Sequence, residues 1–196
     1  MNYLAHIYLS GENELIQIGN FIADQLKGVD KSMFHPDIQK GILLHKHIDS
    51  YTDSHPRVHQ TKKRLHPTVG KYAPVVSDLY YDHFLAIQWQ QYHHQPLLHY
   101  TQQFYDLLHQ HKAILPERTR YILNYIEPNN WLYNYQYIEG MQNVFRGMSR
   151  RARFDNNMEH ATNYLVADYA EYEQDFNSFF PDLIVSCKQF CLTNSF

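Results

Sequence analysis

The feature that most constrains the fold of this chain is the scarcity of glycine and proline inside long stretches of helical periodicity. Its 196 residues include 7 glycines and 8 prolines, and these separate segments whose apolar residues recur with helical rather than alternating spacing. The segment 36–54 shows the pattern well, because Pro36 suits a first helical position and Pro56 discourages continuation. The sequence therefore predicts an all-α fold.

The length suits one domain over residues 1–196, which is enough for a continuous core. The longest apolar runs are far too short to span a bilayer, and the amino end lacks the basic segment of a secretory signal. Only two cysteines are present, so there is no disulfide framework. We expect a cytoplasmic, single-domain helical bundle with no membrane partner. Helices are predicted at 2–9, 13–27, 36–54, 56–66, 72–92, 96–113, 116–126, 129–149 and 156–190, with a break near Pro181 in the last.

The charge balance argues against a nucleic-acid partner. The net charge is −3, whereas general nucleic-acid binding needs a broad basic surface. The exception is a run of four arginines within eight residues: Arg146, Arg150, Arg151 and Arg153. Three of them follow i, i+4, i+7 spacing, so they could steer an acidic protein or clamp a phosphate, or they could be a solvated helix end. The oligomeric state stays open.

Ionisable side chains interrupt the apolar stripe of the segment 36–54. At about 100° per residue, Asp49 lies about 40° from His45, among the isoleucines of the stripe, and Asp53 lies at its edge. The segment 72–92 repeats the four-residue spacing with Asp78 and Asp82, both enclosed by apolar residues. A carboxylate moved out of water is costly unless it is paired, protonated or bound to a metal. We therefore expect these groups to share a partner.

Further polar groups come from the amino-terminal region. Asn20, Asp24 and Lys27 form a polar row at i, i+4 and i+7, and His6 lies in an apolar segment. His83 points about 100° away from Asp82, which favours a supporting or core role over a ligand role.

Taken together, two histidines and four or five aspartates form the mixed nitrogen and oxygen ligand set that Mn²⁺, Mg²⁺ or Fe²⁺ accepts. The set has too many carboxylates for a structural zinc site, and the alternative is a buried network of salt bridges and hydrogen bonds. A divalent site of this kind would supply the acidified water and the charge neutralisation that phosphodiester hydrolysis needs. Neither cysteine has an obvious base nearby, which argues against covalent catalysis.

Several short motifs occur in one order between residue 1 and about residue 155. As a set they resemble the acyl carrier protein phosphodiesterase family, which is similar to the HD-domain metal-dependent phosphohydrolases. The chain departs from the family at Tyr8, where a second histidine is frequent, and at Lys46, where an arginine is common. The motifs are Met1-Asn2-Tyr3-Leu4-Ala5-His6, Gly19-Asn20, Ala23-Asp24, Lys27-Gly28, Gly41-Ile42 with His45, Ile48-Asp49, Thr52-Asp53, Asp78 with Asp82-His83-Phe84-Leu85, Gln142-Asn143-Val144 and Gly147-Met148.

The resemblance implies a helical, manganese-requiring hydrolase that removes 4′-phosphopantetheine from holo acyl carrier protein and leaves the apo form. It implies a metal centre formed by His6, Asp24, His45, Asp49, Asp78 and Asp82. Of these, the expected catalytic residues are Asp24, His45, Asp49 and Asp82. We expect Asn20, Asp53 and His83 to support the ligands, and Lys27, Arg146, Arg150, Arg151 and Arg153 to bind the substrate.

Two other functions are compatible with the sequence. The chain could be a related helical phosphohydrolase that acts on a small nucleotide or another phosphoester. It could also be a helical binding protein with a polar core and no turnover. Metal analysis separates the binding protein from the enzymes, and incubation with holo acyl carrier protein separates the two enzymes.

Overall fold

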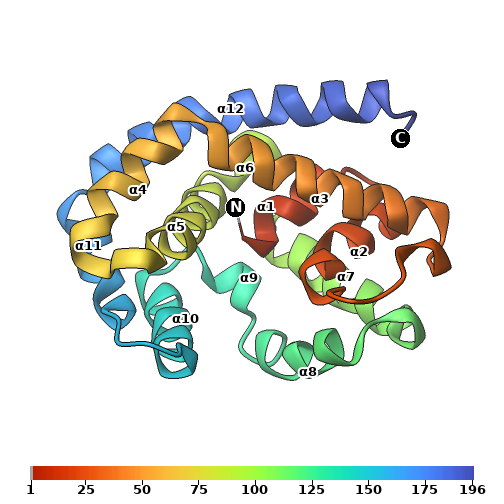
Figure 1. The fold of residues 1–196 in the computed structure, drawn as a ribbon, viewed down its shortest axis with the longest axis horizontal. Helices are drawn as coiled ribbons and strands as arrows, with labels where there is room; N and C mark the ends of the chain where they lie inside the picture. Colours follow the sequence, from red (N-terminus) through yellow and green to blue (C-terminus); the bar gives the residue numbers. More distant parts are fainter. Residues whose placement is uncertain (1) are drawn as a thin grey trace.

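The computed structural model describes residues 2–196, and over these residues it contains helices and no strand (Figure 1). The predicted all-α class is confirmed. No helix in this range is both long enough and apolar enough to cross a bilayer. The helices are α1 (Tyr3–Leu9), α2 (Glu14–Ile22), α3 (Pro36–Ser54), α4 (Pro56–Val69), α5 (Ala73–Ile87), α6 (Trp89–Tyr92), α7 (Leu97–Gln110), α8 (Glu117–Ile126), α9 (Trp131–Asn134), α10 (Ile138–Arg151), α11 (Ala161–Ala167) and α12 (Tyr169–Thr193). Short 3-10 turns include η1 (Ala23–Gln25), η2 (Lys31–Met33), η3 (Gly70–Tyr72), η4 (Lys112–Ile114) and η5 (Met158–His160).

Two glycines allow α2 and α3 to pack with their backbones in contact. A Cβ atom on Gly19 would lie 2.1 Å from the carbonyl oxygen of Ile38, and one on Gly41 would lie 2.2 Å from that of Ile16. No other residue type fits such an approach without moving a backbone. The close packing brings Asn20 of α2 beside His45 of α3, which matters for the site described below.

Helix α5 is the most enclosed helix, and its Asp82 fixes the start of α1. The Asp82 carboxylate is fully buried and accepts hydrogen bonds from the backbone N–H groups of Asn2 (3.3 Å), Leu4 (2.8 Å) and Ala5 (3.3 Å). These N–H groups belong to the first turn of α1 and have no partner inside the helix. Asp82 therefore acts as an N-terminal cap supplied by another helix, and it positions α1 on α5.

An ion pair with a buried carboxylate joins α12 to α4. The Asp175 carboxylate accepts from the Arg64 guanidinium at 2.9 Å and from the Thr61 hydroxyl at 2.9 Å, and Thr61 contacts the Tyr81 hydroxyl of α5 at 2.8 Å. Helix α12 runs along α3 and α4 across one side of the molecule (Figure 1). A single cluster of buried apolar side chains extends from α1 to α12.

Several predicted helix boundaries are wrong; the predicted helix 72–92, for example, is divided into α5 and α6. Helix α12 continues through Pro181, because Phe179, Phe180 and Leu183 around it are fully buried and their packing compensates for the lost backbone hydrogen bond. The predicted helix 129–149 is divided into α9 and α10, because the carbonyl of Tyr135 accepts from Nδ1 of His83 at 2.7 Å and Tyr137 is extended. The predicted helix 156–190 consists of η5, α11 and α12.

Candidate metal centre

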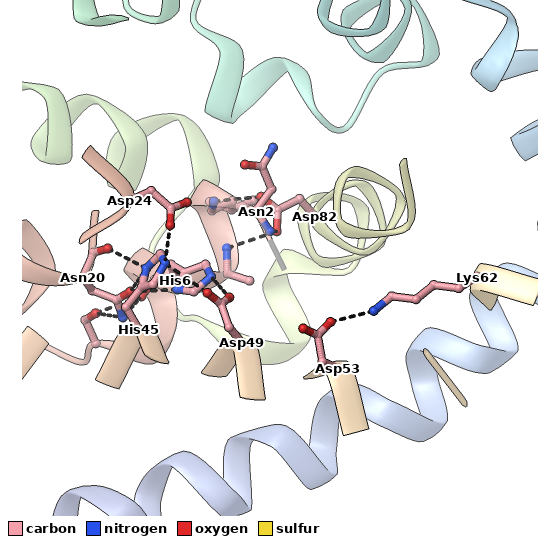
Figure 2. Close-up of polar contacts among 12 residues, drawn as sticks. Asn2, His6, Asn20, Asp24, His45, Asp49, Asp53, Lys62 and Asp82 are labelled. Carbon is pink, nitrogen blue, oxygen red and sulfur yellow. Dashed lines mark hydrogen bonds and ion pairs between the residues drawn. The ribbon is translucent and has the colours of Figure 1, made fainter. Parts of the chain in front are cut away.

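Two buried histidines from different helices lie side by side and face one carboxylate. The imidazole of His6 (α1) stacks on that of His45 (α3), with ring centroids 4.2 Å apart and an angle of 26° between the planes. Nε2 of His6 is 3.3 Å from Oδ1 of Asp49, and Nε2 of His45 is 3.2 Å from Oδ2 of the same side chain (Figure 2). One ligand atom from each of these three residues lies within 4.8 Å of the others.

Asn20 orients both imidazoles. Its Oδ1 is 2.7 Å from Nδ1 of His6 and 3.1 Å from Nδ1 of His45, and its backbone oxygen is 2.9 Å from Nδ1 of His45. Because amide oxygens only accept hydrogen bonds, each Nδ1 carries a proton, so whenever a ring is neutral its lone pair is on Nε2. In that neutral state the lone pair of each ring is directed to the side on which Asp49 lies.

The amide of Asn20 is itself held in one orientation. Asn20 is fully buried, and its Nδ2 donates to the backbone oxygen of His6 at 3.0 Å and to Oγ of Ser10 at 2.9 Å. The Ser10 hydroxyl donates in turn to the backbone oxygen of His6 at 2.8 Å. Sequence reasoning missed Ser10, although its position four residues after His6 on a short helix was a usable signal.

Asp24 adds a second carboxylate from η1. Its Oδ1 is 3.2 Å from Nε2 of His45, and its side chain is mostly exposed. Ligands adjacent to one another around a cation such as Mg²⁺ at about 2.1 Å lie about 3.0 Å apart in octahedral geometry. The distances of 3.2 Å and 3.3 Å between these nitrogens and oxygens are close to that value. His6, His45 and Asp49 therefore form a group that could hold a divalent cation, and the Asp24 carboxylate lies beside it.

The pKa values show how strongly these groups interact. Burial lowers the pKa of His6, and only part of this is opposed by its hydrogen bond to Asp49. Burial also acts to lower the pKa of His45, but the hydrogen bonds to Asp24 and Asp49 outweigh it and raise the pKa to about 9. Burial acts to raise the pKa of Asp49, but the two histidines hold it well below its usual range. The hydrogen bond from His45 lowers the pKa of Asp24. At neutral pH the metal-free centre therefore contains one imidazolium between two carboxylates.

A cavity of about 230 Å³ opens beside these groups. Asp78 of α5 and Asp53 of α3 line it together with the cluster, as do Asn2, Tyr3 and Pro74. Thr52 also lines it, is 2% exposed, and its hydroxyl oxygen has no hydrogen-bond partner among residues 2–196. Thr52 belongs to the motif Thr52-Asp53, and the sequence does not predict a role for it in the site.

Other predicted site residues lie outside the group formed by His6, His45, Asp49 and Asp24. Both oxygens of Asp82 accept from the first turn of α1, and burial raises the pKa of this carboxyl to about 7. His83 contacts the Tyr135 carbonyl oxygen at 2.7 Å and the Tyr169 hydroxyl at 2.9 Å, as expected for a core histidine. Asp53 accepts from Nζ of Lys62 at 2.6 Å. The residues predicted to bind substrate are all exposed: Lys27, Arg146, Arg150, Arg151 and Arg153.

Comparisons with known proteins agree with the motif resemblance. A family model described as acyl carrier protein phosphodiesterase matches residues 1–183. A relative of that name from Serratia proteamaculans (strain 568) is 32% identical over 192 residues, which cover 96% of this chain and 98% of the relative. Another from Escherichia coli (strain K12 / DH10B) is 32% identical over 197 residues, with the same coverage. No solved structure matches the chain, and the similarity to HD-domain architecture stays a prediction.

Proposed function

The chain belongs to the acyl carrier protein phosphodiesterase family, and from that premise we propose that it is a metal-dependent phosphodiesterase that releases 4′-phosphopantetheine from holo acyl carrier protein. The observation that carries the proposal is the convergence of His6, His45 and Asp49 beside a cavity. Three different helices supply these groups and the residue that orients them: His6 comes from α1, Asn20 from α2 and His45 from α3.

The proposed ligands are His6, His45, Asp49 and Asp24, with Mn²⁺ as the preferred ion because the set mixes imidazole with carboxylate. A divalent cation held there would acidify water and offset the charge of the phosphoryl oxygens. Asp78 also lines the cavity and is the proposed group that orients the attacking water. Asp82 is proposed to act through α1, because its three hydrogen bonds determine where His6 lies.

The substrate-binding part of the proposal concerns Lys27 and the arginine run at the end of α10 and just after it. Arg146, Arg150, Arg151 and Arg153 are exposed, and none forms an ion pair with a residue in the described range. Their charge is therefore available to an acidic protein substrate.

Mass spectrometry of the substrate tests the proposal. Holo acyl carrier protein incubated with the purified protein and Mn²⁺ should lose the mass of phosphopantetheine and become the apo form. His45→Ala should abolish this loss, and so should prior removal of metal by a chelator. An unchanged substrate mass with metal-loaded protein would reject the proposed reaction.

A further inference from the structure

One face of α8 carries an exposed stripe of one arginine and two tyrosines. Arg118, Tyr121 and Tyr125 follow i, i+3 and i+7 spacing, which places them on one side of the helix. The tyrosines are 59% and 46% exposed, their ring centroids are 5.0 Å apart, and the Tyr125 hydroxyl donates to that of Tyr121 at 2.9 Å. The buried face of α8 is a different one, formed by Thr119, Leu123 and Ile126. Large aromatic side chains ordered against each other in solvent are typical of contact surfaces.

The arginine of this stripe has no acidic partner. Arg57 and Arg64 of α4 approach Asp175, whereas neither Arg118 nor any of the arginines of α10 pairs with an acidic group in residues 2–196. The tyrosine pair is therefore bordered by uncompensated positive charge. Arginine and tyrosine are the residue types most enriched in protein interfaces and their energetic centres.

Two arginines, Arg118 of the stripe and Arg151 of α10, act electrostatically on Tyr3, a residue that lines the cavity of the candidate metal centre. Burial raises the pKa of Tyr3, which lines the cavity; the charge of Asp24 adds to this, and Arg118 and Arg151 oppose it. The hydrogen bond with Tyr121 raises the pKa of Tyr125, and the charge of Arg151 opposes this rise. Tyr3 therefore lies within electrostatic reach of α8 and of the end of α10. Figure 1 shows α8 and α10 on the same side of the molecule, with α9 between them.

The charges around the cavity and around the stripe are opposite in sign. Asp24, Asp49, Asp53 and Asp78 all line the cavity, whereas the stripe and the end of α10 are basic. A nucleic-acid backbone, with one negative charge at every phosphate, would be repelled where it entered the cavity. An acidic protein that carries a single phosphodiester on a flexible arm is compatible with both regions. Its acidic surface can contact the arginines, while only the arm enters the cavity.

We propose that Arg118, Tyr121 and Tyr125 form a docking surface for an acidic protein, with Arg151 of α10 as the neighbouring positive group. The proposal rests on the proposed function, since it takes the carrier protein as the occupant. It assigns recognition of the protein to α8 and leaves the phosphodiester to the metal centre. The two tasks are therefore separable by mutation.

Arg118→Glu and Arg120→Glu form a matched pair that tests the surface. Both arginines are exposed on α8 and lack an ion pair in the described range, but Arg120 lies about 160° around the helix from Arg118. Arg118→Glu should raise KM for holo acyl carrier protein about tenfold with kcat unchanged, and Arg120→Glu should change KM less than about twofold. Both variants should hydrolyse the small phosphodiester bis(4-nitrophenyl) phosphate at the wild-type rate. Tyr125→Ala should raise KM for the protein substrate in the same way.

Equal effects of Arg118→Glu and Arg120→Glu on KM would overturn the docking surface, because KM would then depend on the net charge of the protein and not on the position of the arginine. Binding of apo acyl carrier protein to the metal-loaded wild type, measured by fluorescence anisotropy, separates docking from turnover. If the wild type binds apo carrier protein in an Arg118-dependent manner but does not cleave the holo form, the proposed function fails and the docking surface stands. Absence of binding, or displacement of the carrier protein by duplex DNA at equal charge concentration, overturns the docking surface.

Discussion

Among single residues, Asn20 has the largest influence on the candidate metal centre, because its side chain contacts both histidines. Asn20→Ala should weaken Mn²⁺ binding by about 10–100-fold, since Nδ1 of His6 loses its acceptor and the ring is free to rotate. Asn20→Asp keeps an oxygen for Nδ1 but loses the donation to Ser10, so we expect an intermediate loss. Titration calorimetry with Mn²⁺ measures both. Wild-type affinity in Asn20→Ala would remove the positioning role.

The protonation of His45 makes metal binding depend on pH. The pKa of His45 in the metal-free centre is about 9, so below that pH the incoming cation must displace a proton. We expect about one proton to be released per ion at pH 7, and affinity for the ion to rise about tenfold per pH unit. Calorimetry in two buffers with different ionisation enthalpies measures the proton directly. Asp49→Asn should reduce the release, and equal heats in both buffers for the wild type would contradict the assignment.

The raised pKa of His45 also makes the stability of the metal-free protein depend on pH. A histidine with a raised pKa in the folded state stabilises the fold fully below its unfolded value near pH 6.5, and this contribution is lost as the pH rises through about 9. Asp49 has a lowered pKa, so its contribution is present above its unfolded value of about 4 and is lost at lower pH. With metal chelated, the melting temperature should therefore fall between about pH 6.5 and 9 in the wild type, and less in His45→Gln.

At the scale of the helices, the cap that Asp82 provides for α1 is the contact most sensitive to substitution. Asp82→Ala should lower the free energy of unfolding of the metal-free protein by about 2 kcal/mol at pH 5, because buried N–H groups lose their acceptor. The folded-state pKa of Asp82 is raised to about 7, so wild-type stability falls as the pH rises from about 4 to 7. The difference between the two proteins should therefore shrink at pH 8.

Urea denaturation at both pH values measures this difference. Asp106→Ala on α7 is the control, since Asp106 is exposed and surface substitutions change the free energy of unfolding by less than about 0.5 kcal/mol. A constant difference between wild type and Asp82→Ala across the pH range would contradict the raised pKa.

Helix α3 shows what the sequence could predict and α9 shows what it could not. Local signals in the sequence predict the ends and the buried face of α3. Pro36 and Pro56 delimit the helix, and its apolar stripe contains His45 and Asp49. The boundary between α9 and α10 depends on His83, which is distant in sequence and binds the Tyr135 carbonyl. The different surroundings of Asp78 and Asp82 in α5 also depend on contacts with distant parts of the chain. Asp78 lines the cavity, whereas Asp82 binds the first turn of α1. The periodicity within α5 does not reveal where α1 lies.

At the scale of the whole molecule, the distribution of charge separates an acidic cavity from a basic surface around α10. Replacing Arg150 and Arg151 together with alanine should raise KM for holo acyl carrier protein about tenfold at low salt, because both residues are exposed and neither forms an ion pair with a described residue. The effect should shrink toward 1 M salt, where the Debye length falls to about 3 Å and the wild type loses the same attraction.

Steady-state kinetics at several salt concentrations distinguish this long-range attraction from a local defect. Replacing Lys46 of α3 and Lys63 of α4 with alanine removes the same net charge from exposed positions on other helices, and this variant should keep the wild-type KM. If the arginine variant lost kcat rather than KM, the two side chains would be acting on the reacting phosphodiester. An unchanged KM at low salt would exclude the end of α10 from docking and leave the stripe on α8 as the only proposed contact for the carrier protein.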